Sequence, residues 1–232
     1  MIDHRKLMEL HVEALFTHDA DAQLVAVNEP RGAAAPRFFL GRTKDGTVRR
    51  YRHDVDPDVR RQLEAASGDD SLPSGALDSP LDASRYEDIL ARVAPVQRSW
   101  TGPAFSFPQE LPKTIDPVQI TAPNTQLLYP HLSAWVPDVS LNPPLFALTF
   151  DGQAVAVCCS VRRTSEAHEV GVETAPPFRG RGYAAQVVAT WARAVRDMGR
   201  VPLYSTSWQN EASRAVARKL ALIQFGNDLH IT

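Results

Sequence analysis

Two arginines alternate with two glycines in the stretch Arg179-Gly180-Arg181-Gly182, and these residue types could bind a phosphate. The strand-like segment EVGVET precedes the stretch, and a strongly periodic helix pattern follows it. Such a junction presents free backbone N–H groups and the positive end of a helix dipole. Glycine admits an anion to the backbone, and arginine adds charge-assisted hydrogen bonds. The spacing predicts an anion site. A tight turn whose glycines serve only packing is also compatible with this sequence.

Two well-known phosphate motifs fit this stretch poorly. GxxxxGK[ST], typical of nucleoside triphosphatases, is absent. The spacing Gly180-x-Gly182-x-x-Ala185 matches a relaxed dinucleotide fingerprint. That motif needs an acidic residue about 20 positions later, where the next strand instead ends in STSWQ. A dinucleotide fold also has a parallel sheet, whereas hairpin-linked strands are expected here. An NAD(P)-binding oxidoreductase is therefore a remote alternative.

The elements around the junction predict one α/β domain. LFALTF and AVAVCCSVRR flank Asp151-Gly152, which is a hairpin signal, and EVGVET follows as a third strand. Apolar residues recur with helical spacing over 184–198, and Gly199 ends that helix. VPLYSTSW predicts a strand, Asn210 a cap for the helix NEASRAVARKLA, and IQFGNDLHIT a closing strand.

This order of elements resembles the Gcn5-related N-acetyltransferase (GNAT) superfamily. The family's pyrophosphate motif is Gln or Arg, two residues, Gly, one residue, then Gly or Ala, and here it reads RGRGYA. The resemblance covers about residues 125–232, includes the later NEAS and ARKLAL elements, and is closest to the glycine N-acyltransferase-like branch at TAPPFRGRGYAA. It implies an α/β (α+β) fold with a mixed, mostly antiparallel sheet flanked by helices.

The resemblance also implies acetyl-CoA as the co-substrate. Its pyrophosphate would bind the loop amides, and its pantetheine arm would pair with the preceding strand. The cofactor-binding residues expected on this basis are Val172, Thr174, Arg179, Gly180, Arg181, Gly182, Tyr183, Ala184, Asn210 and Ser213. Asn210 could equally be a plain helix cap. Arg214, Arg218 and Lys219 would either meet the 3′-phosphate of the ligand or form a solvated helix face.

Acyl transfer to an amine benefits from a general base. The family often has a glutamate about eleven residues before its motif, and counting back from Arg179 gives His168, with Glu169 beside it. Neighbouring strand residues point to opposite faces, so only one of these two can face a thioester. Glu173, nearer the loop, is a third candidate. For each of the three, a structural role at the strand edge is an equal alternative.

One departure from the family concerns the acid that protonates the leaving thiolate. Many members have a tyrosine seven residues after the motif asparagine, where this chain has Ala217. Tyr204, Tyr183, Ser213 or water could replace it, or the thiolate could leave unaided because its pKa of about 8.5 is close to ambient pH. A CoA-binding module without catalysis is therefore the alternative to an enzyme.

The remainder of the chain predicts a smaller α/β unit at residues 1–100 and a Pro-rich connector at 101–124, followed by the acyl-CoA domain at 125–232. The first unit shows a hairpin around Lys44-Asp45-Gly46, a helix that Asp56 caps and Pro57 begins, a polar break at 67–80 and the helix ASRYEDILARV. Prolines exclude a long helix or central strand from the connector.

The role of the first unit stays open between a second copy of the fold, a lid and a dimerisation surface, so a homo-oligomer is compatible with the sequence. The acceptor amine would bind residues 125–142 and this unit.

Composition gives no case for a nucleic-acid or membrane partner. The 25 basic and 27 acidic residues leave a net charge of −2. No apolar run approaches the roughly 20 residues of a membrane span, and the N-terminus lacks a signal pattern, so a cytoplasmic protein is expected. Cys158 and Cys159 are expected to be reduced core residues on opposite strand faces. The HDxD pieces at 18–21 and 53–56 fit a turn and a helix cap, so no metal is expected.

Overall fold

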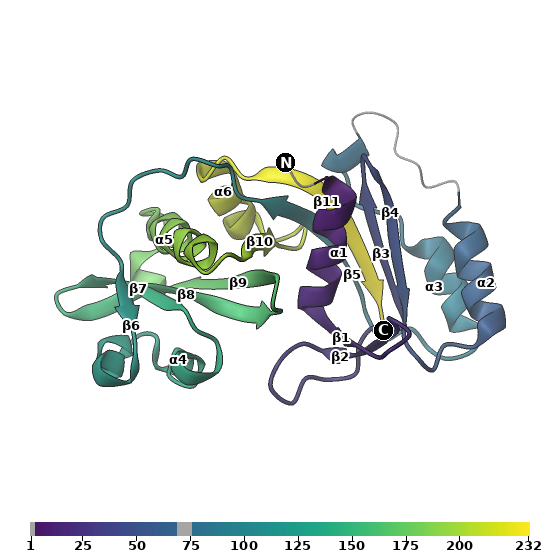
Figure 1. Ribbon diagram of the computed structural model, residues 1–232, viewed down its shortest axis with the longest axis horizontal. Coiled ribbons are helices and arrows are strands. Elements are labelled where there is room, and N and C mark those ends of the chain that lie inside the picture. Colours follow the sequence, from purple (N-terminus) through teal and green to yellow (C-terminus); the bar gives the residue numbers. More distant parts are fainter. Residues whose placement is uncertain (1–2, 69–75) are drawn as a thin grey trace. The chain divides into compact units, whose positions relative to one another are not determined.

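The computed structural model describes residues 3–68 and 76–232. The chain divides into two compact units. Unit 1 comprises residues 1–105, 205–210 and 224–232, and unit 2 comprises residues 106–204 and 211–223. Figure 1 labels their elements. The polar break expected at 67–80 falls partly on residues 69–75, which lie outside the described residues.

Unit 1 contains a sheet with the strand order β4-β3-β11-β5. The expected hairpin is present, because β3 and β4 pair antiparallel on either side of Lys44-Asp45, and β11 pairs antiparallel with β3. A separate two-stranded sheet joins β1 and β2. The bounds are β1 Phe16–His18, β2 Leu24–Val27, β3 Phe38–Thr43, β4 Gly46–Tyr51, β5 Ser99–Ser106 and β11 Ile223–Ile231.

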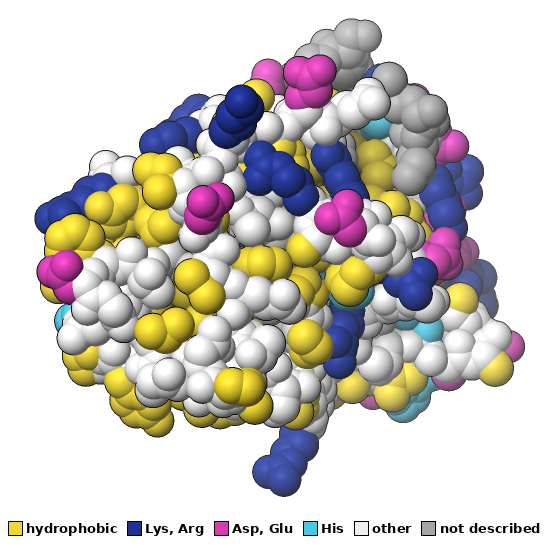
Figure 2. All heavy atoms as spheres, turned by 60° about the vertical axis from the view of Figure 1, so that its left-hand side comes forward, with side chains coloured by type: hydrophobic (Ala, Val, Ile, Leu, Met, Phe, Trp, Pro, Cys, Tyr) yellow, Lys and Arg dark blue, Asp and Glu magenta, His cyan; other side chains and the backbone are white. Residues whose placement is uncertain are grey.

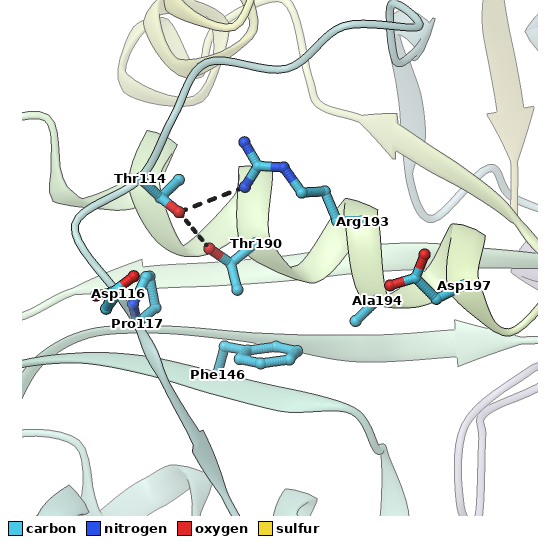
Figure 3. Close-up of a pocket in the computed structure, with 8 residues that line it drawn as sticks. All are labelled: Thr114, Asp116, Pro117, Phe146, Thr190, Arg193, Ala194 and Asp197. Carbon is cyan, nitrogen blue, oxygen red and sulfur yellow. Dashed lines mark hydrogen bonds between the residues drawn. The ribbon is translucent and has the colours of Figure 1, made fainter.

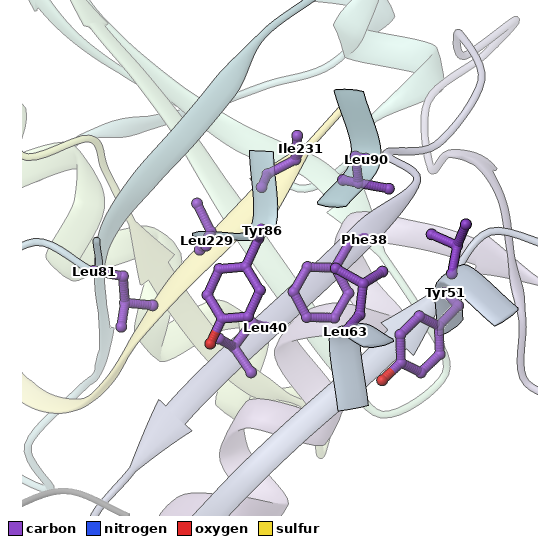
Figure 4. Packing of buried hydrophobic residues seen from close by; sticks show 10 residues of the cluster. Phe38, Leu40, Tyr51, Leu63, Leu81, Tyr86, Leu90, Leu229 and Ile231 are labelled. Atoms are coloured by element: carbon purple, nitrogen blue, oxygen red, sulfur yellow. The ribbon is translucent and has the colours of Figure 1, made fainter. Parts of the chain in front are cut away.

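Helices cover both faces of the unit 1 sheet. They are α1 His4–Leu15, α2 Pro57–Ala66 and α3 Ser84–Ala91, with the short η1 Ala76–Asp78. On one face α2 and α3 bury an apolar cluster that includes Phe38, Leu63 and Tyr86 (Figure 4). On the other face Met8 of α1 packs where Gly41 has no side chain. As the sequence predicts, the Asp56 carboxylate caps α2 by accepting the N–H of Asp58.

The expectation that prolines exclude a central strand from residues 101–124 is wrong at the start of that segment. Ser99–Ser106 forms β5 and contains Pro103. Proline lacks only the N–H group, and the Pro103 carbonyl still accepts a hydrogen bond of 3.3 Å from the N–H of Thr206. Gly102 also lies against the Thr206 carbonyl, where a Cβ atom would overlap it.

Unit 2 contains a sheet with the strand order β10-β9-β8-β7-β6, which is antiparallel except for the parallel pair β9 and β10. Helix α5 lies over one face (Figure 1). Residues 122–141 lie over the other. This arrangement confirms the predicted fold class. The bounds are β6 Val118–Ile120, β7 Leu145–Phe150, β8 Gln153–Arg163, β9 Ala167–Thr174, β10 Val201–Ser205, α5 Tyr183–Asp197, α6 Glu211–Lys219, α4 Asp138–Leu141, η2 Ala122–Leu128, η3 Ser133–Trp135 and η4 Pro176–Phe178.

The adjacent cysteines mark the two faces of this sheet. Cys158 donates to the carbonyl of Val187 on α5, at 3.1 Å, whereas Cys159 belongs to the cluster beneath η2 with Leu128 and Leu132. Both thiols are free and fully buried, and burial raises the pKa of each well above its usual range. The prediction of two reduced core cysteines on opposite faces is confirmed.

The remainder of the Pro-rich segment runs along α5. Two arginines of α5 donate to backbone carbonyls of the Pro-rich segment. Arg196 donates to Phe107, Pro108 and Gln109, and Arg193 donates to Leu111 and Pro112. These contacts satisfy carbonyls of residues 107–112, which lie between β5 and β6, so this stretch follows a fixed course. Among the described helices, none is both long and apolar enough to span a bilayer.

Candidate functional site

The expected anion loop connects β9 to α5. After Thr174 the chain forms η4 and then reaches Gly180 and Gly182, whose φ values are +78° and +79°. These left-handed conformations favour glycine because a Cβ atom would be strained. Space for a Cβ atom at Gly180 is open to 4 Å. The glycines therefore allow both the turn itself and close approach of a ligand to its backbone.

Free backbone donors gather at this turn. Among the described residues, no backbone hydrogen bond is donated by Gly180, Arg181 or Gly182. Tyr183 and Ala184 open α5, where the N–H groups of the first turn have no partner within the helix. That turn contains no acidic side chain, so nothing in it neutralises the positive end of the helix dipole. An anion at this junction would meet N–H donors of the turn and no acidic side chain in the first turn of α5.

The two arginines of the motif fold along the loop. Arg179 Nε donates to the Thr174 carbonyl at 3.1 Å, which ties the loop to the end of β9. The Arg181 guanidinium lies over the ring of Phe178, 5.5 Å from its centroid, and a second contact joins it to the Pro177 carbonyl at 3.5 Å. These contacts engage only part of each guanidinium, so both side chains retain donors at the rim of the turn.

Strand β9 separates from β10 before it reaches the loop. The two strands pair in parallel only at residues 167–169 of β9. From Val170 to Thr174, β9 continues to pair with β8 on its other side. The backbone of Val172 and Thr174 therefore lies on a strand edge that β10 leaves open, which is where a linear ligand arm could add main-chain hydrogen bonds.

The three candidate bases occupy different environments on β9. Glu173 faces η3, because its Oε2 accepts a 2.6 Å hydrogen bond from the indole N–H of Trp135. Glu169 shares that face by strand alternation, but only 2% of its surface is exposed. His168 points to the α5 face instead. The sequence showed the alternation of 168 and 169, yet no sequence signal indicated Trp135 as the partner of Glu173.

His168 belongs to a buried polar group under α5. The Trp191 indole N–H donates to Ser160 Oγ at 3.0 Å, and Ser160 Oγ lies 2.9 Å from His168 Nδ1. Ser160 can thus donate to Nδ1 of a neutral imidazole. Burial, followed by the charges of Arg163 and Arg200, lowers the pKa of His168 to about 4. A group held neutral by burial in this way is a weak base.

This histidine should make the stability of the protein sensitive to acid. Its pKa falls from 6.5 in the unfolded chain to about 4 in the fold. Between these values the unfolded chain takes up a proton that the folded protein does not, so stability is lost as pH falls, by up to about 3 kcal/mol. Urea unfolding from pH 7.5 to 4.5 should show a smaller loss for His168→Gln than for the wild type. An equal loss of unfolding free energy with falling pH in both proteins would contradict the lowered pKa of His168.

A second hydroxyl pair lies beside α6. The Tyr204 hydroxyl is 2.6 Å from Ser213 Oγ and donates to the Ser213 carbonyl at 3.1 Å. Burial raises the pKa of Tyr204 to about 12, so it is protonated at neutral pH. Asn210 belongs to unit 1; its N–H donates to Ser207 immediately before α6 begins. The motif residue Ser213 is therefore in hydrogen-bond contact with Tyr204 through both its side chain and its carbonyl.

A pocket of about 310 Å³ in unit 2 lies against the C-terminal half of α5 (Figure 3). Thr114 bridges Thr190, at 3.0 Å, and Arg193, at 3.3 Å, on its wall. None of the predicted site residues lines it. The lining residues are Thr114, Asp116, Pro117, Phe146, Thr190, Arg193, Ala194 and Asp197.

The described residues contain no cluster of three or more metal-ligating side chains. The carboxylate of Asp19 in the first HDxD piece instead accepts hydrogen bonds from the N–H groups of Asp21 and Gln23, as in a turn.

Figure 2 shows basic and acidic side chains interspersed on one face of the molecule.

Part of the chain that contains this loop is similar to a known protein family. Residues 146–226, about a third of the chain, match the family model described as GNAT acetyltransferase. The match includes β9, the loop, α5 and every predicted site residue. Residues 146–226 are therefore similar to a GNAT acetyltransferase domain. No curated protein sequence matches the chain.

Several solved structures are similar. An acetyltransferase from the GNAT family of Colwellia psychrerythraea has a TM-score of 0.50 at 12% identity, over 79% of this chain and 75% of that one. Because the identity is this low, the similarity between the two proteins concerns only their fold. A GCN5-related N-acetyltransferase from Kribbella flavida has a TM-score of 0.49 at 14% identity, over 99% of this chain and 95% of that chain. A GNAT-family protein from Novosphingobium aromaticivorans gives 0.49 at 19% identity, over 59% of this chain and 65% of that chain.

Proposed function

We propose that the protein is an acyl-CoA-dependent N-acyltransferase that transfers an acetyl group directly to an amine of a small molecule or peptide. The observation that carries the proposal is the glycine turn with its free N–H groups at the start of α5, inside the segment that matches the GNAT acetyltransferase model. The letters TAPPFRGRGYAA favour the glycine N-acyltransferase-like branch.

The residues present fit the diphosphate of acetyl-CoA. The N–H groups of residues 180–184 supply donors without competing partners, and Arg179 and Arg181 supply cations at the rim. The open edge of β9 at Val172 and Thr174 suits the amide groups of the pantetheine arm. Acetyl-CoA, when bound, supplies an activated thioester.

Glu173 is the base that this geometry favours. An amine with a lysine-like pKa near 10.4 costs about 4 to 5 kcal/mol to deprotonate at pH 7, so a positioned proton acceptor matters. Trp135 holds one carboxylate oxygen of Glu173 and leaves Oε1 for the amine or an intervening water. Glu169 lies deeper, and His168 faces the opposite side of the sheet. Trp135 also lies in the segment 125–142, which we propose binds the acceptor amine.

The proton for the leaving thiolate has a candidate donor in Ser213, supported by the protonated Tyr204 hydroxyl. Ala217 is buried at the position where the family often has tyrosine. That alanine is the observation in favour of a second candidate function, a CoA-binding regulatory module without catalysis.

A thiol-release assay tests the proposal. With acetyl-CoA and a panel of primary amines, we expect at least one amine to raise thiol release above the rate without amine, in proportion to acylated product. Binding of acetyl-CoA without release for any amine would favour the regulatory module. Absence of both would contradict the proposed function.

A further inference from the structure

Helix α6 carries three basic residues whose side chains have different partners. Arg214 pairs with Glu211 at 2.5 Å, and Arg218 approaches the same carboxylate at 3.8 Å. Lys219 forms no ion pair with any described residue. A solvated helix face accounts for the two arginines, because they are exposed or half-buried and share an acidic partner. It does not account for where the Lys219 side chain lies.

Lys219 extends over the glycine turn. A Cβ atom on Gly182 would overlap Lys219 Nζ and would stand 3.1 Å from Cε and 3.7 Å from Cδ. The end of the lysine side chain therefore lies against the Gly182 backbone, in space that only the absence of a side chain there provides. This contact joins two segments 37 residues apart in sequence.

The position is electrostatically unfavourable for the chain alone. A cation at a helix N-terminus opposes the helix dipole. Arg179 and Arg181 bring two further positive charges to the same loop. The first turn of α5 has no acidic residue to offset them. An anionic ligand of more than one charge would satisfy all of these groups together.

We propose that Lys219 binds the diphosphate of the acyl-CoA ligand and so completes, from α6, the site formed by the glycine turn. The proposal rests on the proposed function. It assigns Lys219 to the diphosphate, not to the 3′-phosphate, because its ammonium lies on Gly182 itself in the middle of the turn. Lysine contributes here as a compact point charge with three donors.

Calorimetry with Lys219→Met tests this assignment, because methionine keeps an unbranched stem and removes the charge. We expect about tenfold weaker binding of acetyl-CoA and the same factor for 3′-dephospho-acetyl-CoA. Acetyl-pantetheine, which has no diphosphate, should bind both proteins equally. Arg218→Met, on the same helix, is the matched control and should stay within about twofold of the wild type. Equal unfolding midpoints would show that the fold is intact.

Two results would overturn the assignment. Unchanged affinity of Lys219→Met for both nucleotides would show that the ammonium contributes nothing. A loss for acetyl-CoA but not for its dephospho form would place Lys219 at the 3′-phosphate. A wild-type protein that binds no acetyl-CoA is a different result, because it removes the proposed function and this inference with it.

Discussion

Gly182→Asp is expected to abolish measurable acetyl-CoA binding, with a loss of at least about 100-fold in affinity. The change puts a carboxylate where the diphosphate would lie, and like charges in close contact cost several kcal/mol. It also fills the space that Gly182 leaves open and displaces the end of Lys219. Titration calorimetry of the variant and the wild type measures the difference.

Gly199→Asp is the matched control for this variant. Gly199 has a similar φ of +72° at the other end of the same helix, and space for its Cβ atom is open to 4 Å. Both variants should lose similar stability from backbone strain, on the order of 1 kcal/mol. Only Gly182→Asp should lose binding. Equal affinities in the two variants would remove the turn from the binding site.

Glu173→Gln should have the second large effect, a fall in kcat of about 10²- to 10⁴-fold with unchanged affinity for acetyl-CoA. Glutamine keeps the size of the side chain and can still accept the Trp135 N–H bond, but it cannot take the proton of the amine. Steady-state kinetics with the best amine of the panel, together with calorimetry, separates catalysis from binding.

Glu169→Gln and His168→Ala serve as comparisons for this prediction. The buried Glu169 and the α5-facing His168 should matter mainly for stability, so kcat per folded molecule should change little. A collapse of kcat in Glu169→Gln, with normal turnover in Glu173→Gln, would move the base to the deeper carboxylate. Wild-type kcat in all three variants would remove the base from β9 altogether.

Local signals in the sequence were sufficient for much of the fold. The Asp-Gly turns predicted both hairpins, because their flanking segments carry strand residues. The apolar spacing over 184–198 predicted α5, and the RGRG letters predicted a glycine turn at its start. Each of these features depends on residues close together in the chain, where propensity and backbone conformation decide the outcome.

Features that depend on distant residues could not be predicted in this way. The hydrogen bond between Trp135 and Glu173 and the contact of Lys219 with Gly182 follow from how elements pack. Strand β5 escaped prediction because Pro103 reads as a strand breaker unless the partner of its carbonyl is known. Alternation showed that His168 and Glu169 face opposite sides, but only the packing of α5 showed which side each takes.

The most direct test of the central claim is the amide NMR spectrum of the ¹⁵N-labelled protein during titration with acetyl-CoA. If the backbone of the glycine turn binds the diphosphate, the amide protons of Gly180, Arg181 and Gly182 should move downfield and saturate together. NAD⁺ at the same concentration should leave them in place. Saturable binding of acetyl-CoA that leaves these three amides unshifted would contradict the account.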